Sequence, residues 1–326
     1  MDDSPDGKEM LNSRNALIIA LEAGLLLLIN LIALSGNLFL CYVIYNKPKY
    51  HTTTNILILA LTMCYGFIAL FVMPFTVGVL ITGRWVFGRV VCDIQAFLFL
   101  DLTWISLLMV TLMTISRFFK ATRLGFYKKW LSTERSYAMI MGIWLFVTIV
   151  LVCTEARSST IYGFSPKDSI CFISFSTEYA TKHTIYAVVT LALYVSLPIV
   201  SIILWSAMQR HNVTVAHFKT DDGQPIQRSE DELRKSAEER KTNQLLFCLI
   251  MSVMVFWLPA VVINILAFSM TLPRRAQLAS TFFWFAVPAT HPIIYGALYR
   301  PFSKEVMRAL PTTVKRQNQV YAEEAL

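Results

Sequence analysis

Seven long apolar stretches, almost free of charged side chains, constrain this chain of 326 residues more than any other feature of its sequence. Each is close to or longer than the roughly 20 residues that a helix needs to cross a bilayer. Because a bilayer offers no water to backbone polar groups, such stretches must be helical. The sequence therefore predicts an all-α membrane protein, a seven-transmembrane helix bundle, with spans at residues 23–45, 51–83, 94–116, 136–154, 183–209, 242–273 and 276–299.

The overall composition supports a membrane protein. Hydrophobic residues make up 56% of the chain and charged residues only 15%. A soluble domain has roughly 45–50% apolar and about 25% charged residues. The apolar residues run continuously instead of alternating, which disfavours membrane-spanning strands.

The distribution of basic residues predicts the orientation of the bundle. Most of the 29 Lys and Arg residues fall in the loops after the first, third and fifth spans and in the segment after the seventh. The positive-inside rule makes this side cytoplasmic and the N-terminus extracellular. A net charge of +8 could also indicate nucleic-acid binding. Charges that flank spans fit attraction to a lipid membrane instead, so no nucleic-acid partner is expected.

Three regions are predicted along the chain. Residues 1–22 form an extracellular N-terminus and the start of the first helix, and their acidic character is unlike a cleavable signal peptide. Residues 23–299 form the transmembrane domain. Residues 300–326 form a short amphipathic eighth helix and a cytoplasmic tail. Phe302, Val306 and Leu310 recur every fourth residue there, which is typical of a helix on the membrane surface.

Two of the six cysteines stand apart from the others. Four lie inside the apolar stretches, where cysteine behaves as a small apolar residue. The predicted topology places Cys92 and Cys171 at the extracellular face. Because that compartment is oxidising, a disulfide between these two residues is expected.

Short motifs recur in order along the spans. A single Trp or Pro in an apolar stretch is usually only packing or a kink, so each motif alone is weak evidence. The motifs are Gly36-Asn37, Met73-Pro74-Phe75, Trp85-Val86-Phe87-Gly88, Cys92, Ser116-Arg117-Phe118, Trp144, Pro198, Phe256-Trp257-Leu258-Pro259 and His291-Pro292-Ile293-Ile294-Tyr295. In this order, and on these helices, they resemble the rhodopsin-like (class A) G protein-coupled receptors.

The resemblance implies a plasma-membrane receptor and not an enzyme. Such a receptor binds an extracellular small-molecule ligand, activates a heterotrimeric G protein and needs no cofactor or metal. The stretch 84–94 looks most like the amine and melatonin receptors. Amine receptors place a carboxylate at the position of Phe99, whereas Asp101 lies about 200° around the helix and is expected to contact the fourth helix. Phe285 stands where an opsin needs its retinal lysine, which disfavours an opsin.

The resemblance also implies a ligand pocket without a fixed charge. Such a lining suits a neutral, partly apolar small molecule. Asn264 offers both a donor and an acceptor to a ligand. Alternatively, it bonds only within its own helix. The pocket positions carried over are Phe99, Thr103, Thr190, Tyr194, Trp257, Ala260, Asn264, Thr281 and Phe285.

The family's switch region maps onto a second group of residues. Ser116 replaces the carboxylate that usually neighbours Arg117, and Glu239 stands where the family has an acidic partner on the sixth helix. An Arg117–Glu239 ion pair is therefore expected to restrain the inactive state. Alternatively, Glu239 belongs only to the solvated charge run 238–241. Pro292 and Tyr295 belong to the same switch by resemblance.

A sodium site common in the family is not expected here. The family builds it with an Asp and an Asn, at the positions of Tyr65 and His291. A hard cation prefers carboxylate and other oxygen ligands, and only Ser106 keeps one. Tyr65 and His291 either hydrogen-bond to each other and fill the cavity, or simply pack a drier bundle with no switching role.

Other functions remain alternatives. A transporter is disfavoured because internal repeats are not apparent. A hydrolase is disfavoured because the five His are scattered and no nucleophile motif occurs. The departures at Tyr65, Ser116, Ser206 and His291 favour, as the runner-up, a receptor-fold protein with constitutive or weak coupling. A peptide-binding receptor also stays open.

Overall fold

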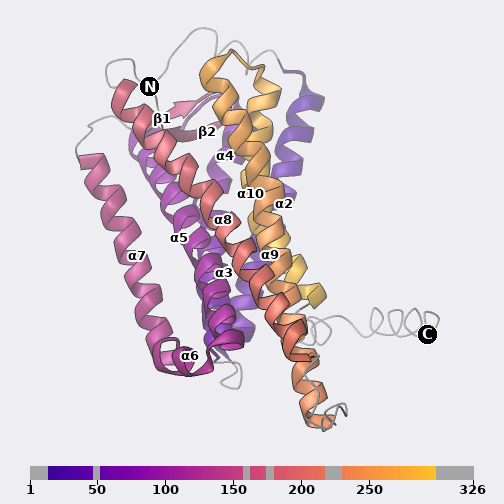
Figure 1. Cartoon of the computed structure of the whole chain (residues 1–326). Coiled ribbons are helices and arrows are strands. Elements are labelled where there is room, and N and C mark those ends of the chain that lie inside the picture. The colour runs from indigo at the N-terminus through magenta and orange to yellow at the C-terminus, as the bar shows by residue number, and fades with distance from the viewer. Residues whose placement is uncertain (1–13, 47–51, 157–161, 174–179, 217–229, 299–326) are drawn as a thin grey trace, which may run out of the picture.

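Seven long helical segments lie side by side in the computed structural model, which describes residues 14–46, 52–156, 162–173, 180–216 and 230–298 (Figure 1). Each of them covers one of the predicted spans, so the seven-helix bundle is confirmed. The eighth helix expected at 300–310 lies outside the described residues. The segments are α2 (Ala16–Tyr45), α3 (Thr53–Phe71) with α4 (Met73–Thr82), α5 (Gly88–Thr122), α7 (Thr133–Ala156), α8 (Ala180–Ala216), α9 (Glu230–Ser269) and α10 (Arg274–Leu298).

The outer surface of the bundle is apolar. Within the described residues, five segments are long and apolar enough to cross a membrane, namely α2, α3 with α4, α5, α7 and α9. On α2, Leu26, Ala33 and Leu40 are buried at a spacing of seven residues, while Leu25 and Leu28 are exposed. Exposed leucines of this kind face lipid, which is as apolar as the side chains themselves.

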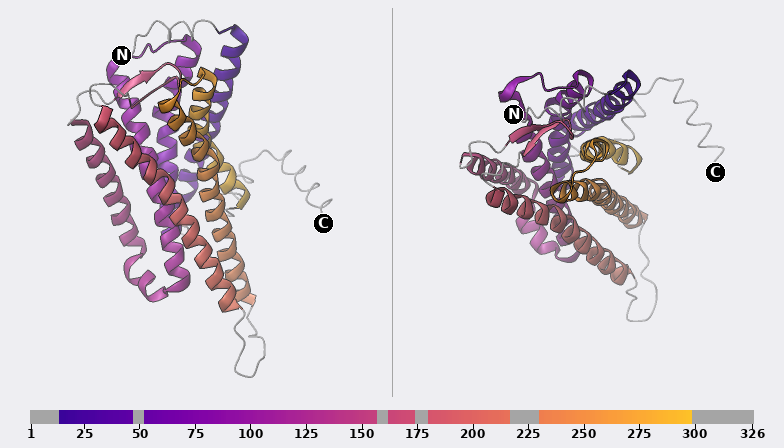
Figure 2. Two further views of the ribbon diagram at one scale, coloured as in Figure 1. Left: turned by 45° about the horizontal axis from the view of Figure 1, so that its top comes forward. Right: turned by 90° about the horizontal axis from the view of Figure 1, so that it is seen from above.

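Helix α5 is the central helix of the bundle. It contacts α3, α7, α8 and α9 and both strands of a small hairpin. The view along the bundle in Figure 2 shows the other helices around it. The disulfide Cys92–Cys171 lies near the start of α5. We call this the disulfide end of the bundle. The opposite end carries Arg117 and the short helix α6 (Leu124–Trp130).

The second predicted span is broken at Val72, where α3 ends and α4 begins. Pro74 lies in the first turn of α4, and proline cannot donate a helical hydrogen bond. The Gln95 side chain on α5 donates to the Val72 carbonyl at 2.9 Å and to the Thr76 hydroxyl at 3.2 Å. A neighbouring helix therefore hydrogen-bonds to the backbone at the break.

Helices α2 and α10 meet at another proline. Pro292 has no N–H, so the carbonyl of Pro288 lacks its helical donor. Asn37 on α2 supplies a hydrogen bond to that carbonyl at 2.9 Å. Gly36, the preceding residue, packs directly against the Pro292 ring, and a Cβ at position 36 would overlap it. The Gly36-Asn37 motif thus fixes the contact between the two helices.

A buried ion network joins the same two helices at their outer ends. Arg274, the first residue of α10, donates from both terminal nitrogens to the Glu22 carboxylate on α2, at 2.8 and 2.9 Å. Arg14 donates to the same carboxylate at 2.8 Å. The side chains of Arg14, Arg274 and Glu22 are only 5%, 8% and 16% exposed. The sequence did not predict this network, because residues 1–22 were assigned only as the extracellular N-terminus and the start of the first helix, without partners for Glu22.

Replacing Glu22 with alanine should destabilise the bundle strongly. The change leaves two buried guanidinium groups without their carboxylate, and breaking a buried pair by removing one partner costs roughly 3–5 kcal/mol. A thermal melt of the purified protein measures the loss. The control is Asp93→Ala, because Asp93 pairs with Arg89 at 3.0 Å in a much more exposed position. Exposed pairs of this type contribute about 0.3–0.5 kcal/mol. Equal losses in the two variants would contradict a structural role for the network.

Candidate functional site

A two-stranded hairpin covers the disulfide end of the bundle. Strands β1 (Tyr162–Ser165) and β2 (Ile170–Ile173) pair antiparallel, with Phe164 opposite Cys171. The Cys92–Cys171 disulfide, with its Cα atoms 5.3 Å apart, ties β2 to α5 and confirms the predicted pairing. The hairpin itself was not predicted, because two four-residue strands in a loop carry too short a pattern to detect.

Three further hydrogen bonds hold the hairpin. The Gln95 side chain accepts from the backbone N–H of Cys171 at 3.0 Å, so Gln95 serves both the break at Val72 and the hairpin. Arg89 donates to the Tyr162 carbonyl at 2.8 Å. On the other side, Thr281 of α10 donates to the Asp168 carbonyl at 2.8 Å. The hairpin is therefore anchored to α5 on one side and to α10 on the other.

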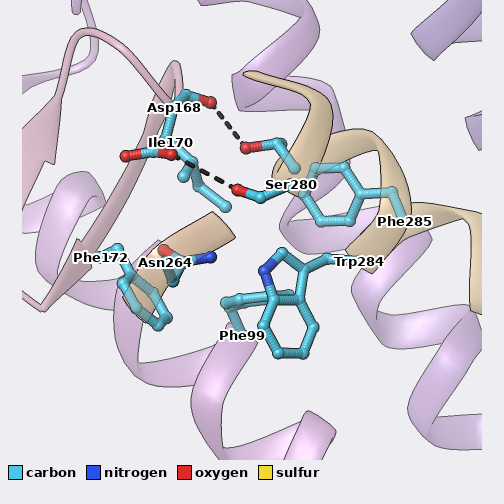
Figure 3. A pocket seen from close by; sticks show the side chains of 9 residues that line it. Phe99, Asp168, Ile170, Phe172, Asn264, Ser280, Trp284 and Phe285 are labelled. Atoms are coloured by element: carbon cyan, nitrogen blue, oxygen red, sulfur yellow. Dashed lines mark hydrogen bonds between the residues drawn. The ribbon is translucent and has the colours of Figure 1, made fainter. Parts of the chain in front are cut away.

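A small pocket, partly open to solvent, lies beneath the hairpin (Figure 3). Helices α5, α9 and α10 and the hairpin all contribute to its lining. The lining residues are Phe99, Asp168, Ile170, Phe172, Asn264, Ser280, Thr281, Trp284 and Phe285.

Aromatic rings dominate the inner part of this pocket. Phe99 makes edge-to-face contacts with Phe172, Trp284 and Phe285, at centroid separations of 5.8, 6.0 and 5.8 Å. Trp284 in turn packs on Trp257 at 5.5 Å. Edge-to-face pairs hold rings more firmly than apolar burial alone. The pocket therefore has a rigid aromatic wall.

Four of the predicted pocket residues meet here, namely Phe99, Asn264, Thr281 and Phe285. The other predicted positions lie elsewhere. Trp257 lies beside Trp284 and also borders a second cavity between α8 and α9. Thr103 and Ala260 are buried in the bundle. Thr190 and Tyr194 fall on α8, but their side chains lie outside the described part of the chain.

Asn264 matches both interpretations that the sequence left open. Its amide nitrogen donates to the Ala260 carbonyl of its own helix at 2.7 Å. Its side chain also lines the pocket. The amide oxygen is therefore the atom of Asn264 best placed to serve a ligand.

Asp168, at the tip of the hairpin, corrects the expectation of a pocket without fixed charge. Its carboxylate accepts hydrogen bonds from Ser165 at 2.5 Å and from Ser280 at 3.5 Å. Burial raises the pKa of the Asp168 carboxyl, and these two hydrogen bonds oppose that shift. The expectation was wrong because the carboxylate reaches the pocket through a hairpin that sequence patterns did not indicate.

Asp101 behaves as predicted. It points away from the pocket toward α7, where Thr148 donates to its carboxylate at 3.1 Å. The expected structural contact with the fourth membrane helix is confirmed, and Asp101 does not line the ligand pocket.

At the opposite end, Arg117 has partners other than the one predicted. Its guanidinium donates to the Asn243 side-chain oxygen at 3.0 and 3.2 Å and to the backbone carbonyl of Glu239 at 3.3 Å. The Glu239 carboxylate instead pairs with Lys120 at 2.9 Å. The predicted Arg117–Glu239 ion pair is therefore wrong, although Arg117 does bind α9 at this turn. Ser116 is buried, and its hydroxyl makes no hydrogen bond within the described residues.

Tyr65 and His291 fill the middle of the bundle, but not by bonding to each other. Their rings pack edge-on at 4.7 Å, and both residues are almost fully buried. The His291 Nε2 atom hydrogen-bonds to Ser252 of α9 at 3.0 Å. The predicted Tyr65–His291 hydrogen bond is therefore wrong.

Tyr295, one turn after His291, is also fully buried and packs edge-on against the His291 ring at 6.3 Å. Pro292 is buried in the contact with Gly36.

Signalling is expected to show no specific dependence on sodium. Two rings occupy the region where the family's ion pocket would need carboxylate and amide oxygens. Basal signalling should stay unchanged when N-methylglucamine chloride replaces NaCl at constant ionic strength. A sodium effect that Ser106→Ala abolishes would contradict this prediction.

The bundle, the disulfide-anchored hairpin over a pocket and the Arg117 contact at the far end define a seven-helix membrane receptor. Residues 36–295 match the family described as "7 transmembrane receptor (rhodopsin family)". The chain belongs to this family. It is a multi-pass membrane protein and a receptor, not an enzyme.

Three relatives show how far the likeness extends. The chain is 25% identical to the high-affinity lysophosphatidic acid receptor of Xenopus laevis over 206 residues, 62% of this chain and 54% of that receptor. It is 28% identical to G-protein coupled receptor 161 of Danio rerio over 149 residues, 44% of this chain and 28% of the relative. It is 30% identical to 5-hydroxytryptamine receptor 1B of Canis lupus familiaris over 122 residues, 37% and 31% of the two chains. The chain thus matches about half or less of the length of these relatives. Two of them are named for different ligands, so likeness alone does not choose a ligand.

Proposed function

We propose that this receptor binds a partly apolar small molecule in the pocket beneath the hairpin and activates a heterotrimeric G protein at the Arg117 end. The proposal places the disulfide end and the N-terminus outside the cell, in the plasma membrane. The observation that carries it is the aromatic pocket between α5, α9 and α10, because the same α5 and α9 form the Arg117 contact. A ligand that shifts these helices biases both ends of the bundle together.

The distribution of charge supports this orientation. The Arg117 end carries Lys120 and Arg123 at the end of α5 and Lys128 and Lys129 on α6. The positive-inside rule favours the cytoplasm for such a cluster. The disulfide at the other end fits an oxidising exterior.

A second candidate function, constitutive signalling, has one specific observation in its favour. Ser116 stands where a carboxylate would hold Arg117, and its hydroxyl makes no hydrogen bond within the described residues. Arg117 is therefore restrained through neutral acceptors on α9. Neutral acceptors hold a cation less strongly than a carboxylate does.

A cell assay that reports cAMP and calcium tests both candidates. Cells expressing the receptor, with and without a ligand library, are compared with cells expressing Arg117→Ala at equal surface level. We expect a signal, basal or ligand-dependent, that the variant lacks. An N-terminal epitope tag should be detected on intact cells. A tag that is detected only after permeabilisation would overturn the orientation, and equal signals from the two receptors would overturn the coupling role.

A further inference from the structure

Asp168 lines the pocket, and among the described residues its carboxylate contacts no cationic side chain. Its two oxygens receive hydrogen bonds only from the neutral hydroxyls of Ser165 and Ser280. Within the described part of the chain, Asp168 takes part in no ion pair, although the charge of its neighbour Lys167 attracts it. A carboxylate removed from water is costly unless a cation compensates for it. The described residues do not place a cation in contact with this carboxylate.

The surroundings of Asp168 suit an organic cation better than a metal ion. Figure 3 shows the carboxylate at one end of the pocket and the rings of Phe99 and Trp284 at the other. With Phe172 and Phe285, these rings give the pocket aromatic walls. Aromatic faces attract ammonium groups through their negative quadrupole, most strongly when water is excluded. The amide oxygen of Asn264 adds a further acceptor on the α9 side.

We propose that the ligand carries a cationic nitrogen, a primary or quaternary ammonium on an aromatic or other apolar group, and that this nitrogen ion-pairs with Asp168. This inference rests on the pocket named in the proposed function. The proposal places the ammonium under the hairpin and not against helix α5. On α5, Phe99 lines the pocket, whereas the Asp101 carboxylate points away from it and bonds to Thr148. An anionic ligand is disfavoured, because the Asp168 carboxylate would repel its negative charge.

Direct binding to the purified receptor tests the ligand class. The probes are tryptamine, phenethylamine and benzyltrimethylammonium, each compared with a neutral counterpart of similar shape: tryptophol, 2-phenylethanol and neopentylbenzene. Binding is measured as the concentration dependence of the Tm. At least one primary ammonium probe should raise the Tm and bind about 10- to 100-fold more tightly than its counterpart, the ratio expected for a charge-assisted hydrogen bond. Benzyltrimethylammonium has no N–H to donate, so it tests the contribution of charge and aromatic contact alone. No shift from any ammonium probe at millimolar concentration, or equal binding of the neutral probes, would overturn the proposal.

Two variants locate the charge. Asp168→Asn keeps the shape and the hydrogen-bond acceptor but removes the negative charge, so the preference for the ammonium should disappear. Asp168→Glu keeps the charge and should keep the preference. The matched control is Asp93→Asn, at the same end of the bundle but paired with Arg89, which should bind as the wild type does. An unchanged preference in Asp168→Asn overturns the role of Asp168. If that variant does not fold, the comparison of the probe pairs on the wild type still decides the ligand class.

The binding assay contains no G protein, so the two proposals fail separately. A receptor that binds the ammonium probes but activates no G protein contradicts the proposed function alone. A receptor that signals but prefers neutral probes contradicts only the assignment of the ligand class.

Discussion

A receptor with Cys92 replaced by serine is expected to lose about 2–5 kcal/mol of stability, the usual loss when a native disulfide is removed. The bond closes a segment of 79 residues and is the covalent tie between the hairpin and α5. Without it, only hydrogen bonds such as the one between Gln95 and Cys171 N–H hold β2 in place. Ligand binding should fall as well, because the hairpin carries Asp168 and Phe172 into the pocket.

Thermal melting and surface expression measure this effect. The matched control is Cys153→Ser, because Cys153 is an exposed free thiol on α7 and its loss should change neither quantity. Cys171→Ser should equal Cys92→Ser, and the double variant should add nothing further, since all three remove the same bond. A melt of Cys92→Ser that matches the Cys153 control would contradict a stabilising role for the disulfide.

Asn243→Ala is expected to raise basal signalling by roughly tenfold. The Asn243 side chain accepts two hydrogen bonds from the Arg117 guanidinium. Hydrogen bonds to charged groups are worth about 1.5–3 kcal/mol, and a contact present in only one state shifts the populations by that amount. Glu239→Ala should have a smaller effect, because the carboxylate pairs with Lys120 and only the backbone carbonyl reaches Arg117.

Comparing Asn243→Ala with Glu239→Ala shows whether the Asn243 amide or the Glu239 carboxylate restrains Arg117. Basal cAMP or calcium signals are measured at equal surface expression, with Thr242→Ala as the control. The Thr242 hydroxyl bonds only to the Glu238 carbonyl of its own helix, so this change should be silent. If Glu239→Ala activates more strongly than Asn243→Ala, an acidic restraint on Arg117 operates after all.

The fold was predictable because each membrane span is a long and uniform signal. The apolar stretches needed no tertiary information, since lipid forces each of them to be a helix. Whether a proline inside an apolar stretch breaks the helix could not be decided from the residue type alone. Pro74 separates two helices at Val72, while Pro198 stays inside α8.

The partner of Arg117 could not be chosen from the sequence. Glu239 and Asn243 lie four residues apart on α9, so both present their side chains on the same face of the helix. Charge favoured Glu239 in the prediction. Lys120, one turn after Arg117 on α5, takes that carboxylate instead. Competition between two neighbouring cations is a property of the packed helices and has no sequence signature.

Tyr65 and His291 show the same limit in the core. Their proximity followed from the family's positions and is found at 4.7 Å. The hydrogen bond was assigned to the wrong partner because Ser252, from a third helix, also lies within reach. The pocket residues divide similarly: Phe99 and Phe285 were predictable from their helices, whereas Asp168 depends on a turn between short strands.

The unequal anchors of the hairpin have a kinetic consequence. The α5 side is held by a covalent bond, whereas the α10 side is held by hydrogen bonds from Thr281 and Ser280 to Asp168. The hairpin is therefore expected to separate from the bundle more readily on the α10 side than at Cys171. If the ligand pairs with Asp168 as proposed, lifting the α10 side of the hairpin also breaks that ion pair. The energy barrier for opening the hairpin and the barrier for losing the ligand contact are then crossed in a single step. Affinity differences among ligands of this receptor should then appear mainly as differences in residence time.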